Sequence, residues 1–288
     1  MKIDLHLHTT ASDGTDTPAE LVSLASGLGE NCVIAITDHD TVDGLASAED
    51  ALTPLVKLIK GIEFSCAVRG DKSFRCHIIG YGMDISNPSI ISAIDEGRRK
   101  RLEKKKKRLE YLEKNFGIVF TKEELAILDK YDSVGKLHLG NLIVARGMCD
   151  NVSDAIDKYL SGYSLPDDRI SAKLAISAIC QAGGVAVWAH PLGGEREKRI
   201  DAEEVRKRLD VLSSFGLGGL ECFYSRYTKD EAEMLVKIAD EFSLSVSAGS
   251  DYHGKNKTVA FGALGMDGYT PSATEVSILP LLGIEIQE

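Results

Sequence analysis

Short apolar runs alternate along most of the chain with stretches whose apolar residues recur at helical spacing. The strand-like runs are 2–8, 31–40, 56–70, 74–83, 185–191, 218–225 and 244–253. The helix-like stretches are 17–29, 44–52, 171–184, 202–216 and 229–243, and Thr17 and Pro18 supply an N-cap and a first helical residue. This alternation predicts an α/β fold with a mostly parallel sheet covered by helices. So many units favour a closed or nearly closed β/α barrel.

The alternation is interrupted between about residues 90 and 164, where the pattern is helical throughout. A charged run rich in lysine and arginine begins this region, and an apolar face along it is expected from Leu102, Leu109, Leu112 and Phe116. We predict a barrel made of residues 1–95 and 168–288, and a helical insertion of residues 96–167 that caps the substrate.

The composition and net charge of the chain argue against several classes of protein. The chain has 288 residues and a net charge of −10, which argues against a surface that coats nucleic acid. The six cysteines are scattered and form no CxxC pair, as expected of reduced thiols in a cytoplasmic protein. The amino terminus does not read as a secretory signal, and no run is long enough for a membrane helix, so we expect no membrane association. We infer no obligate protein partner.

Polar residues with ligand chemistry gather at or near the strand-like runs. His6 and His8 lie two apart on one strand face, and Asp251 and His253 repeat that spacing. The other members of the set are Asp13, His39, Glu63, His77 and His190. In β/α barrels the residues that follow the strands meet at one mouth, so we expect these nine side chains to converge.

Each of these residues has an ordinary structural interpretation when taken alone. A strand-end histidine is more often a hydrogen-bonded core residue than a ligand, and Asp13 before Gly14 is typical of a turn. Together, however, so many histidines and carboxylates would be costly to bury without positive charge between them. Imidazole and carboxylate without thiolate favour Mn²⁺, with Zn²⁺ and Fe²⁺ as alternatives, and nine donors suit two or three ions.

The motifs DLHLHTTASDG, ITDHDTVDG, GIEFS, CHIIGYG, AVWAHP and AGSDYHG resemble those of the PHP (polymerase and histidinol phosphatase) family of metal-dependent phosphoesterases. The resemblance implies a distorted seven-stranded β/α barrel, TIM-like in outline. Within the family, the chain is most similar to the branch with a helical insert that includes nucleoside 3′,5′-bisphosphate phosphatases.

The resemblance also implies a division of the nine donors into metal sites. His6, His8, Glu63 and Asp251 would hold a first ion, and Glu63 would bridge to a second ion that His77 and His190 complete. Asp13, His39 and His253 would hold a third. Some relatives have histidine in place of Asp13.

These ligands predict a phosphoesterase in which an activated water attacks phosphorus. Ions that share a water would lower its pKa towards about 7 and would offset charge on the phosphate oxygens. We expect Glu63 to be essential for catalytic activity. The proton for the leaving group is expected from the neighbourhood of Asp13, His39 and His253.

Substrate specificity is expected from the insert, where relatives tend to read Gly-Arg-x-His-x-Ala-Arg. His138 and Lys136 match this motif in part, while Asn141 replaces its last arginine. A second departure follows the AHP motif, where Arg196 is expected to compensate for a missing arginine. We predict that His138, Lys136 and Arg196 contact substrate phosphate. His138 in a purely structural role is the alternative.

The basic run over residues 98–108 is interpreted as a solvated helix face rather than an RNA-binding surface, because aromatic stacking partners are sparse in the sequence. The predicted substrate is a small phosphorylated metabolite, first of all the 3′-phosphate of a nucleoside 3′,5′-bisphosphate, with extension to short RNA ends. A cyclic phosphodiesterase acting on a ribose cyclic phosphate is the main alternative. A histidinol-phosphate phosphatase and a non-catalytic metal-binding module rank below it.

Overall fold

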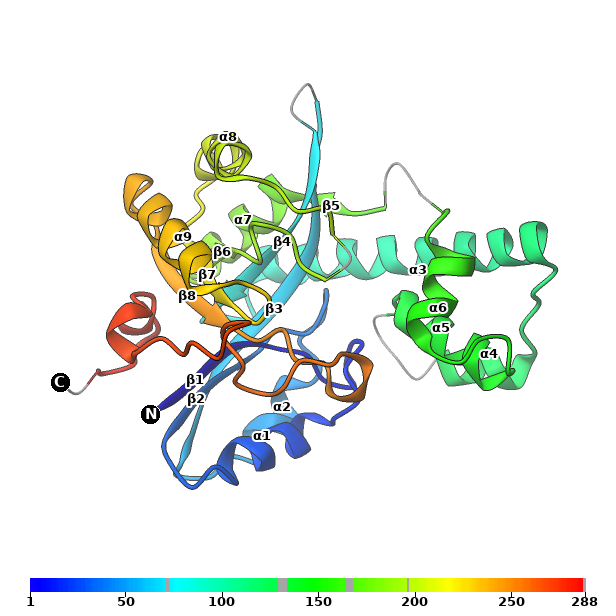
Figure 1. Cartoon of the computed structure of the whole chain (residues 1–288), viewed down its shortest axis with the longest axis horizontal. Helices are drawn as coiled ribbons and strands as arrows, with labels where there is room; N and C mark the ends of the chain where they lie inside the picture. Colours follow the sequence, from blue (N-terminus) through cyan, green and yellow to red (C-terminus); the bar gives the residue numbers. More distant parts are fainter. Residues whose placement is uncertain (71–72, 129–133, 164–167, 196, 287–288) are drawn as a thin grey trace.

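The computed structural model describes residues 1–70, 73–128, 134–163, 168–195 and 197–286. One curved sheet runs through seven strands in the order β1-β2-β3-β4-β6-β7-β8 (Figure 1). Their bounds are β1 Lys2–Leu7, β2 Cys32–Ile36, β3 Val56–Val68, β4 Phe74–Tyr81, β6 Val185–Trp188, β7 Gly219–Tyr224 and β8 Ser245–Gly249. The two-residue β5 (Ile170–Ser171) pairs with β3 off this path. The predicted α/β barrel of seven strands is confirmed.

The barrel closes where the segment after β8 meets the end of β1. The amide of Asp251 donates to the carbonyl oxygen of His6 at 2.9 Å, and the amide of His8 donates to that of Tyr252 at 3.0 Å. This seam places the first and last strands of the barrel side by side, and with them the two histidine-containing motifs.

One strand gives the barrel its distortion. β4 runs antiparallel to both β3 and β6, whereas the other neighbours along the sheet are parallel. β3 ends at Val68 and β4 begins at Phe74, and a connection this short permits only antiparallel pairing. The pairing sets His77 opposite Ser65, two residues from Glu63.

Helices cover the outside of the barrel. They are α1 (Pro18–Ser26), α2 (Leu45–Asp50), α7 (Ala172–Gln181), α8 (Ala202–Ser213) and α9 (Lys229–Glu241). Thr17 caps α1 through a reciprocal pair of bonds with Glu20, and Pro18 is its first residue, as the sequence predicts. Single 3₁₀ turns follow at Gly254–Asn256, Ala273–Glu275 and Leu279–Leu282. Within the described ranges, none of the helices combines the length and apolar content needed to cross a bilayer.

The helical region projects from one side of the barrel (Figure 1). It consists of α3 (Pro88–Phe116), α4 (Lys122–Leu128), α5 (Lys136–Ala145), α6 (Val152–Ala155) and a π-helical turn, Ile156–Leu160. Helix α3 continues without a break through residue 96, the predicted start of the insertion. Its residues Ile90 and Ile94 belong to the barrel core, whereas Leu112 belongs to a second core formed by the helical region. One long helix therefore links the two hydrophobic cores.

Two expectations for α3 hold only in part. Of the expected apolar face, Leu112 is buried and Leu109 packs against the second core, whereas Leu102 is 63% exposed and Phe116 is 40% exposed. The basic run expected to be solvated has a buried side, which consists of four residues of 6–8% exposure: Lys100, Arg101, Lys104 and Arg108. This face packs towards the barrel, where it finds counter-charges: Arg101 pairs with Asp40, and Lys104 Nζ lies 3.3 Å from Asp168 Oδ2.

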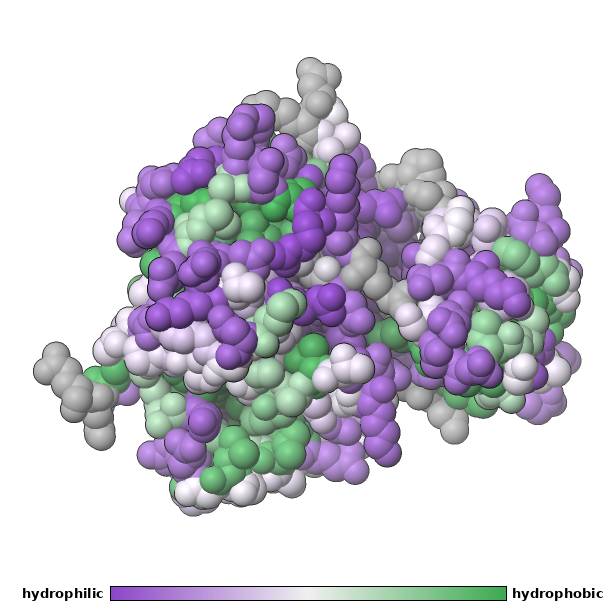
Figure 2. Space-filling view, in the orientation of Figure 1, coloured by the Kyte–Doolittle hydropathy of each residue, from purple (hydrophilic) through white to green (hydrophobic). Residues whose placement is uncertain are grey.

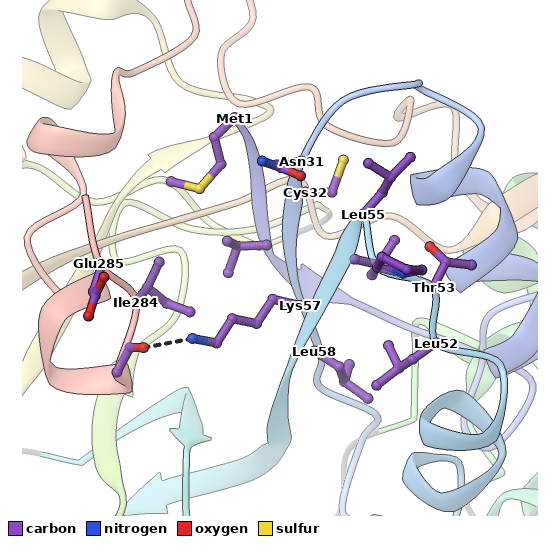
Figure 3. Close-up of a pocket in the computed structure, with 14 residues that line it drawn as sticks. Met1, Asn31, Cys32, Leu52, Thr53, Leu55, Lys57, Leu58, Ile284 and Glu285 are labelled. Atoms are coloured by element: carbon purple, nitrogen blue, oxygen red, sulfur yellow. Dashed lines mark hydrogen bonds between the residues drawn. The ribbon is translucent and has the colours of Figure 1, made fainter. Parts of the chain in front are cut away.

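A cavity of about 670 Å³ opens at the end of the barrel where β1, β2 and β3 begin (Figure 3). Apolar side chains including Leu52, Leu55 and Ile284 line it, and Lys57 Nζ donates to the carbonyl oxygen of Gly283 at 2.7 Å. The predicted ligands lie at the other end of the barrel.

Candidate metal centre

All nine predicted metal ligands converge at the carboxyl-terminal mouth of the barrel. They come from segments widely separated in the sequence, and seven are less than 9% exposed. The side chains of His39 and His77 are 12% and 15% exposed. Three groups of donor atoms lie close enough to share an ion: His6, His8 and Asp251; His39, Glu63 and His77; and His8, Asp13, His39 and His253.

The first group surrounds the Nε2 atoms of His6 and His8, which lie 3.1 Å apart. Asp251 Oδ1 is 3.6 Å from the first and 3.4 Å from the second. Glu63 approaches the same atoms, with Oε1 3.5 Å from His6 Nε2 and Oε2 3.3 Å from His8 Nε2. Because β1 alternates its side chains, both histidines project into the barrel mouth together.

The second group forms around Glu63. Its Oε1 lies 2.9 Å from His77 Nδ1 and 3.4 Å from His190 Nε2. Its Oε2 lies 2.9 Å from His39 Nδ1. Glu63 thus stands between the first and second groups, the position that a bridging carboxylate requires.

The third group contains Asp13, His39 and His253. His253 Nε2 is 3.1 Å from Asp13 Oδ1, and His39 Nε2 is 3.9 Å from Asp13 Oδ2. His8 also faces this group, since its Nδ1 lies 3.7 Å from Asp13 Oδ1. The three groups therefore form one continuous cluster.

The cluster is suited to cations. Burial would raise the pKa of Glu63, but His77, His39 and His6 hold it well below its usual range, so the carboxylate is ionised. Burial and the neighbouring His253 lower the pKa of His8 well below its usual value, which favours the neutral imidazole that metals bind. His39 Nδ1 and Glu63 Oε2 are buried, and although they lie 2.9 Å apart, neither has a hydrogen bond of acceptable geometry among the described residues. Glu221 and Glu63 act in the opposite direction on His6 and raise its pKa, and Glu197 and Glu63 raise that of His190 to about 10. Carboxylates held ionised beside this many imidazoles fit divalent ions, whose positive charge would take the place of those protons.

Several residues that the sequence analysis missed support the ligands. Glu221 is fully buried: its Oε1 lies 2.9 Å from His6 Nδ1, and its Oε2 accepts a 2.7 Å bond from the amide of His190. The outer oxygen of Asp251 lies 2.9 Å from Tyr224 Oη and 2.6 Å from Lys257 Nζ. Such outer contacts fix the orientation of metal ligands. A lone acid in the apolar run GGLECFYS was the available signal for Glu221.

The backbone at the mouth is constrained. His190 and Asp251 have φ angles of +34° and +60°, a conformation that non-glycine residues adopt rarely and mostly at functional sites. At the closing seam, a Cβ on Gly249 would lie 2.1 Å from the Cβ of His6. Only glycine lets β8 approach β1 this closely.

Of the three residues predicted to contact substrate, the two that the structure describes, His138 and Lys136, lie near the cluster. His138 is 5% exposed, and its Nδ1 accepts a 3.0 Å bond from the amide of Gly135, at the start of α5. Burial lowers the pKa of His138, while Asp13 opposes that shift. Lys136 lines a cavity beside the cluster. Arg196 lies outside the described residues.

That cavity has a volume of about 380 Å³ and is strongly basic. His77 and His190 form part of its wall, so it opens directly onto the cluster. Among the described residues, Glu197 is the one acid of its lining, against the five cations Arg75, Lys136, Arg169, Lys198 and Arg208. We call this space the basic cavity.

The chain belongs to the PHP domain family, whose model matches residues 4–164. Its family, together with the clustered imidazoles and carboxylates, makes it a metal-dependent phosphoesterase. It is 33% identical over 264 residues to a 5′-3′ exoribonuclease of Haemophilus influenzae, covering 88% of this chain and 90% of that protein. It is 28% identical to a 3′,5′-nucleoside bisphosphate phosphatase of Chromobacterium violaceum, covering 87% of each chain.

A third relative is a phosphoribosyl 1,2-cyclic phosphate 1,2-diphosphodiesterase of Eggerthella lenta, 28% identical, with 88% of this chain and 94% of that protein covered. Among solved structures, an amidohydrolase from C. violaceum superposes with a TM-score of 0.81 at 26% identity, covering 98% and 96% of the two chains. A metal-dependent phosphoesterase from Bifidobacterium adolescentis gives 0.77 at 32% identity, covering 92% and 93%.

Proposed function

We propose that this enzyme hydrolyses phosphoesters of substrates that carry a second phosphate: the 3′-phosphate of a nucleoside 3′,5′-bisphosphate and, by extension, the end nucleotides of short RNA. The observation that carries the proposal is the basic cavity, because it shares His77 and His190 with the metal cluster. A substrate with one phosphate at the cluster could place the other among the cations. Relatives named for both activities support the same substrate class.

The proposed ligands are divided among three ions as the resemblance to the PHP family implies. His6, His8, Asp251 and Glu63 would hold one ion, Glu63 with His77 and His190 a second, and Asp13 with His39 and His253 a third. Mn²⁺ is the first choice, with Zn²⁺ and Fe²⁺ as alternatives. Bound divalent ions would supply an acidified water as nucleophile and positive charge for the phosphate oxygens.

The chain's own residues would do the remaining work. Lys136 and Arg169 would bind the phosphate that does not react and so orient the scissile bond. His138, next to the Asp13 group, would contact the reacting phosphate. Residues 96–167 would act as a cap, because α3 and α5 bring Lys104 and Lys136 towards the barrel mouth. A closed cap would exclude bulk water from the charged site.

A cyclic phosphodiesterase is the second candidate. Its support is the altered insert motif: Asn141 stands where relatives carry arginine, and its side-chain amide lies 3.5 Å from Asn256 Oδ1 rather than adding a cation. The relative from E. lenta carries this kind of activity in its name. Such a substrate would make less use of the basic cavity.

The experiment is a comparison of substrates on Mn²⁺-loaded protein: adenosine 3′,5′-bisphosphate, 5′-phosphorylated oligoribonucleotides and ribose cyclic phosphates. We expect turnover of the first two. Turnover of the cyclic compounds alone would replace the proposal with the second candidate, and no turnover with metal bound would refute both.

A matched pair of variants tests the role of the basic cavity. Lys136→Met should raise KM for the bisphosphate but not for a simple monophosphate ester, whereas Lys136→Arg should retain most binding of the bisphosphate. Equal effects of Lys136→Met on both substrates would argue against a second phosphate site.

A further inference from the structure

Four aromatic side chains that are scattered along the sequence meet on the helical region. The ring centroids of Tyr111 and Tyr163 are 5.1 Å apart, those of Tyr111 and Phe116 are 5.8 Å apart, and those of Phe116 and Tyr159 are 5.1 Å apart. Tyr159 is buried beneath the others, Phe116 is 40% exposed, and Tyr111 and Tyr163 are partly exposed. We call this group the aromatic cluster.

Basic residues flank the aromatic cluster. Lys107, Arg108 and Lys114 lie three or four residues from Tyr111 and therefore share its side of α3. Lys158 Nζ lies 4.9 Å from the centre of the Tyr159 ring. Acids share this neighbourhood: Lys107 Nζ lies 2.6 Å from Glu103 Oε1, and Glu110 and Asp168 are close enough to Tyr163 to contribute to its raised pKa. Figure 2 shows hydrophilic and hydrophobic residues interspersed over the visible face of the helical region.

The aromatic cluster is connected to the metal centre by a row of cations. Lys104, Arg108 and Tyr111 occupy one face of α3, and about 10 Å of helix separates Lys104 from Tyr111 at a rise of 1.5 Å per residue. Arg108 and Lys107 are close enough to Tyr163 to influence its pKa. Lys104 and Arg108 in turn lie close to Arg169 of the basic cavity.

Buried atoms in this row lack partners. The Nε atoms of Arg108 and Arg169 are both buried, with no hydrogen bond among the described residues. Burial lowers the pKa of Arg108 to about 10, and the neighbouring Arg101 adds to the shift. Cations crowded together in this way gain most from an anion that lies along them.

We propose that the cluster of Tyr111, Phe116 and Tyr163 is a stacking platform for the bases of single-stranded RNA whose scissile end lies at the metal centre. Lys107 and Arg169, which are partly exposed, would contact the backbone phosphates between the two sites, since Lys104 and Arg108 are buried against the barrel. Stacked aromatic side chains beside a basic track are the usual means of binding single strands without sequence preference. This inference rests on the proposed function, and it favours an oligonucleotide over a mononucleotide as the better substrate.

The test compares KM across 5′-phosphorylated oligoribonucleotides of increasing length, with adenosine 3′,5′-bisphosphate as the substrate too short to reach the platform. In the unaltered enzyme, KM should fall as the strand lengthens. Tyr111→Ala and Tyr163→Ala should each raise KM for the long strands by roughly 5- to 100-fold. Both variants should leave KM for the bisphosphate unchanged, and Tyr111→Phe and Tyr163→Phe should behave like the unaltered enzyme.

The proposed stacking platform would be refuted if KM of the wild-type enzyme did not change with strand length. It would also be refuted if KM of the alanine variants still fell with strand length as in the wild type. If an alanine variant also loses turnover of the bisphosphate, its fold has changed, and cross-linking of the wild-type protein decides. Strands containing 5-iodouridine should then attach to Tyr111, Phe116 or Tyr163 on irradiation, and attachment confined to other regions would refute the inference. A wild-type enzyme that cleaves no phosphoester at all would instead refute the proposed function.

Discussion

Lys104 offers a prediction that connects the burial of charge to substrate binding. Its side chain is 8% exposed, with Nζ 3.3 Å from Asp168 Oδ2. Burial lowers its pKa to about 7, and Arg101, Arg169 and Arg108 add to the shift, while Asp168 opposes it. The protein without substrate therefore carries a lysine that is costly to charge.

The sign of the pH dependence follows from these values. In the unfolded chain Lys104 stays protonated up to about pH 10.4, whereas in the folded protein it loses its proton near pH 7. Between these pH values the unfolded chain binds more protons, so this residue makes stability rise with pH across that window. Below about pH 7 the folded protein bears the full cost of the charge.

Lys104→Met removes that cost. A shift of about 3.5 pKa units corresponds to roughly 5 kcal/mol. Because Asp168 loses one partner and keeps Arg75, at 3.3 Å, we expect a net gain of roughly 2–4 kcal/mol near pH 6. The gain should vanish above about pH 10. The variant should also bind the bisphosphate more weakly, because it lacks the Lys104 ammonium group that would pair with a bound phosphate.

The assay is urea denaturation in a phosphate-free buffer at several pH values, together with KM for the bisphosphate. Lys106→Met is the matched control, since Lys106 is exposed on the same helix and should alter neither quantity. A Lys104→Met variant that is no more stable near pH 6, or whose advantage is the same at all pH values, would refute the reasoning.

Three further predictions concern the metal centre. Glu63→Gln should abolish turnover with little change in far-UV circular dichroism, because the bridging charge is lost but the volume is kept; near-normal turnover would contradict its role. Glu221→Gln should weaken Mn²⁺ binding, measured by calorimetry, about 10- to 100-fold, because His6 and His190 lose their common partner. The control Glu203→Gln, on the exposed face of α8, should leave Mn²⁺ binding unchanged. Removing metal with a chelator should lower the thermal midpoint, and Mn²⁺ should restore it; an unchanged midpoint would mean that bound ions do not compensate the buried donors.

The barrel and the convergence of the donors could be predicted because both depend on local patterns. The spacing of His6 and His8 places them on one face of β1 whatever the rest of the chain does. Strand ends of a barrel share a mouth, so His190 and Asp251 had to lie near them. The division of the donors among ions stays a prediction, as do the boundaries of the cap.

Other features depended on contacts between distant segments. Glu221 supports His6 from 215 positions away, and nothing near it in sequence points to that partner. The burial of Lys104 depends on how α3 lies against the barrel, which a helical pattern does not reveal. Aromatic residues looked sparse because Tyr111 and Tyr163 meet only after the helical region has folded.

The seam between β1 and β8 has a consequence for synthesis of the enzyme. His6 leaves the ribosome early and His253 late, so a growing chain holds an incomplete set of ligands until nearly all of it has been made. Contacts this distant in sequence also form slowly. A nascent chain would therefore hold no complete metal centre until its translation is nearly finished.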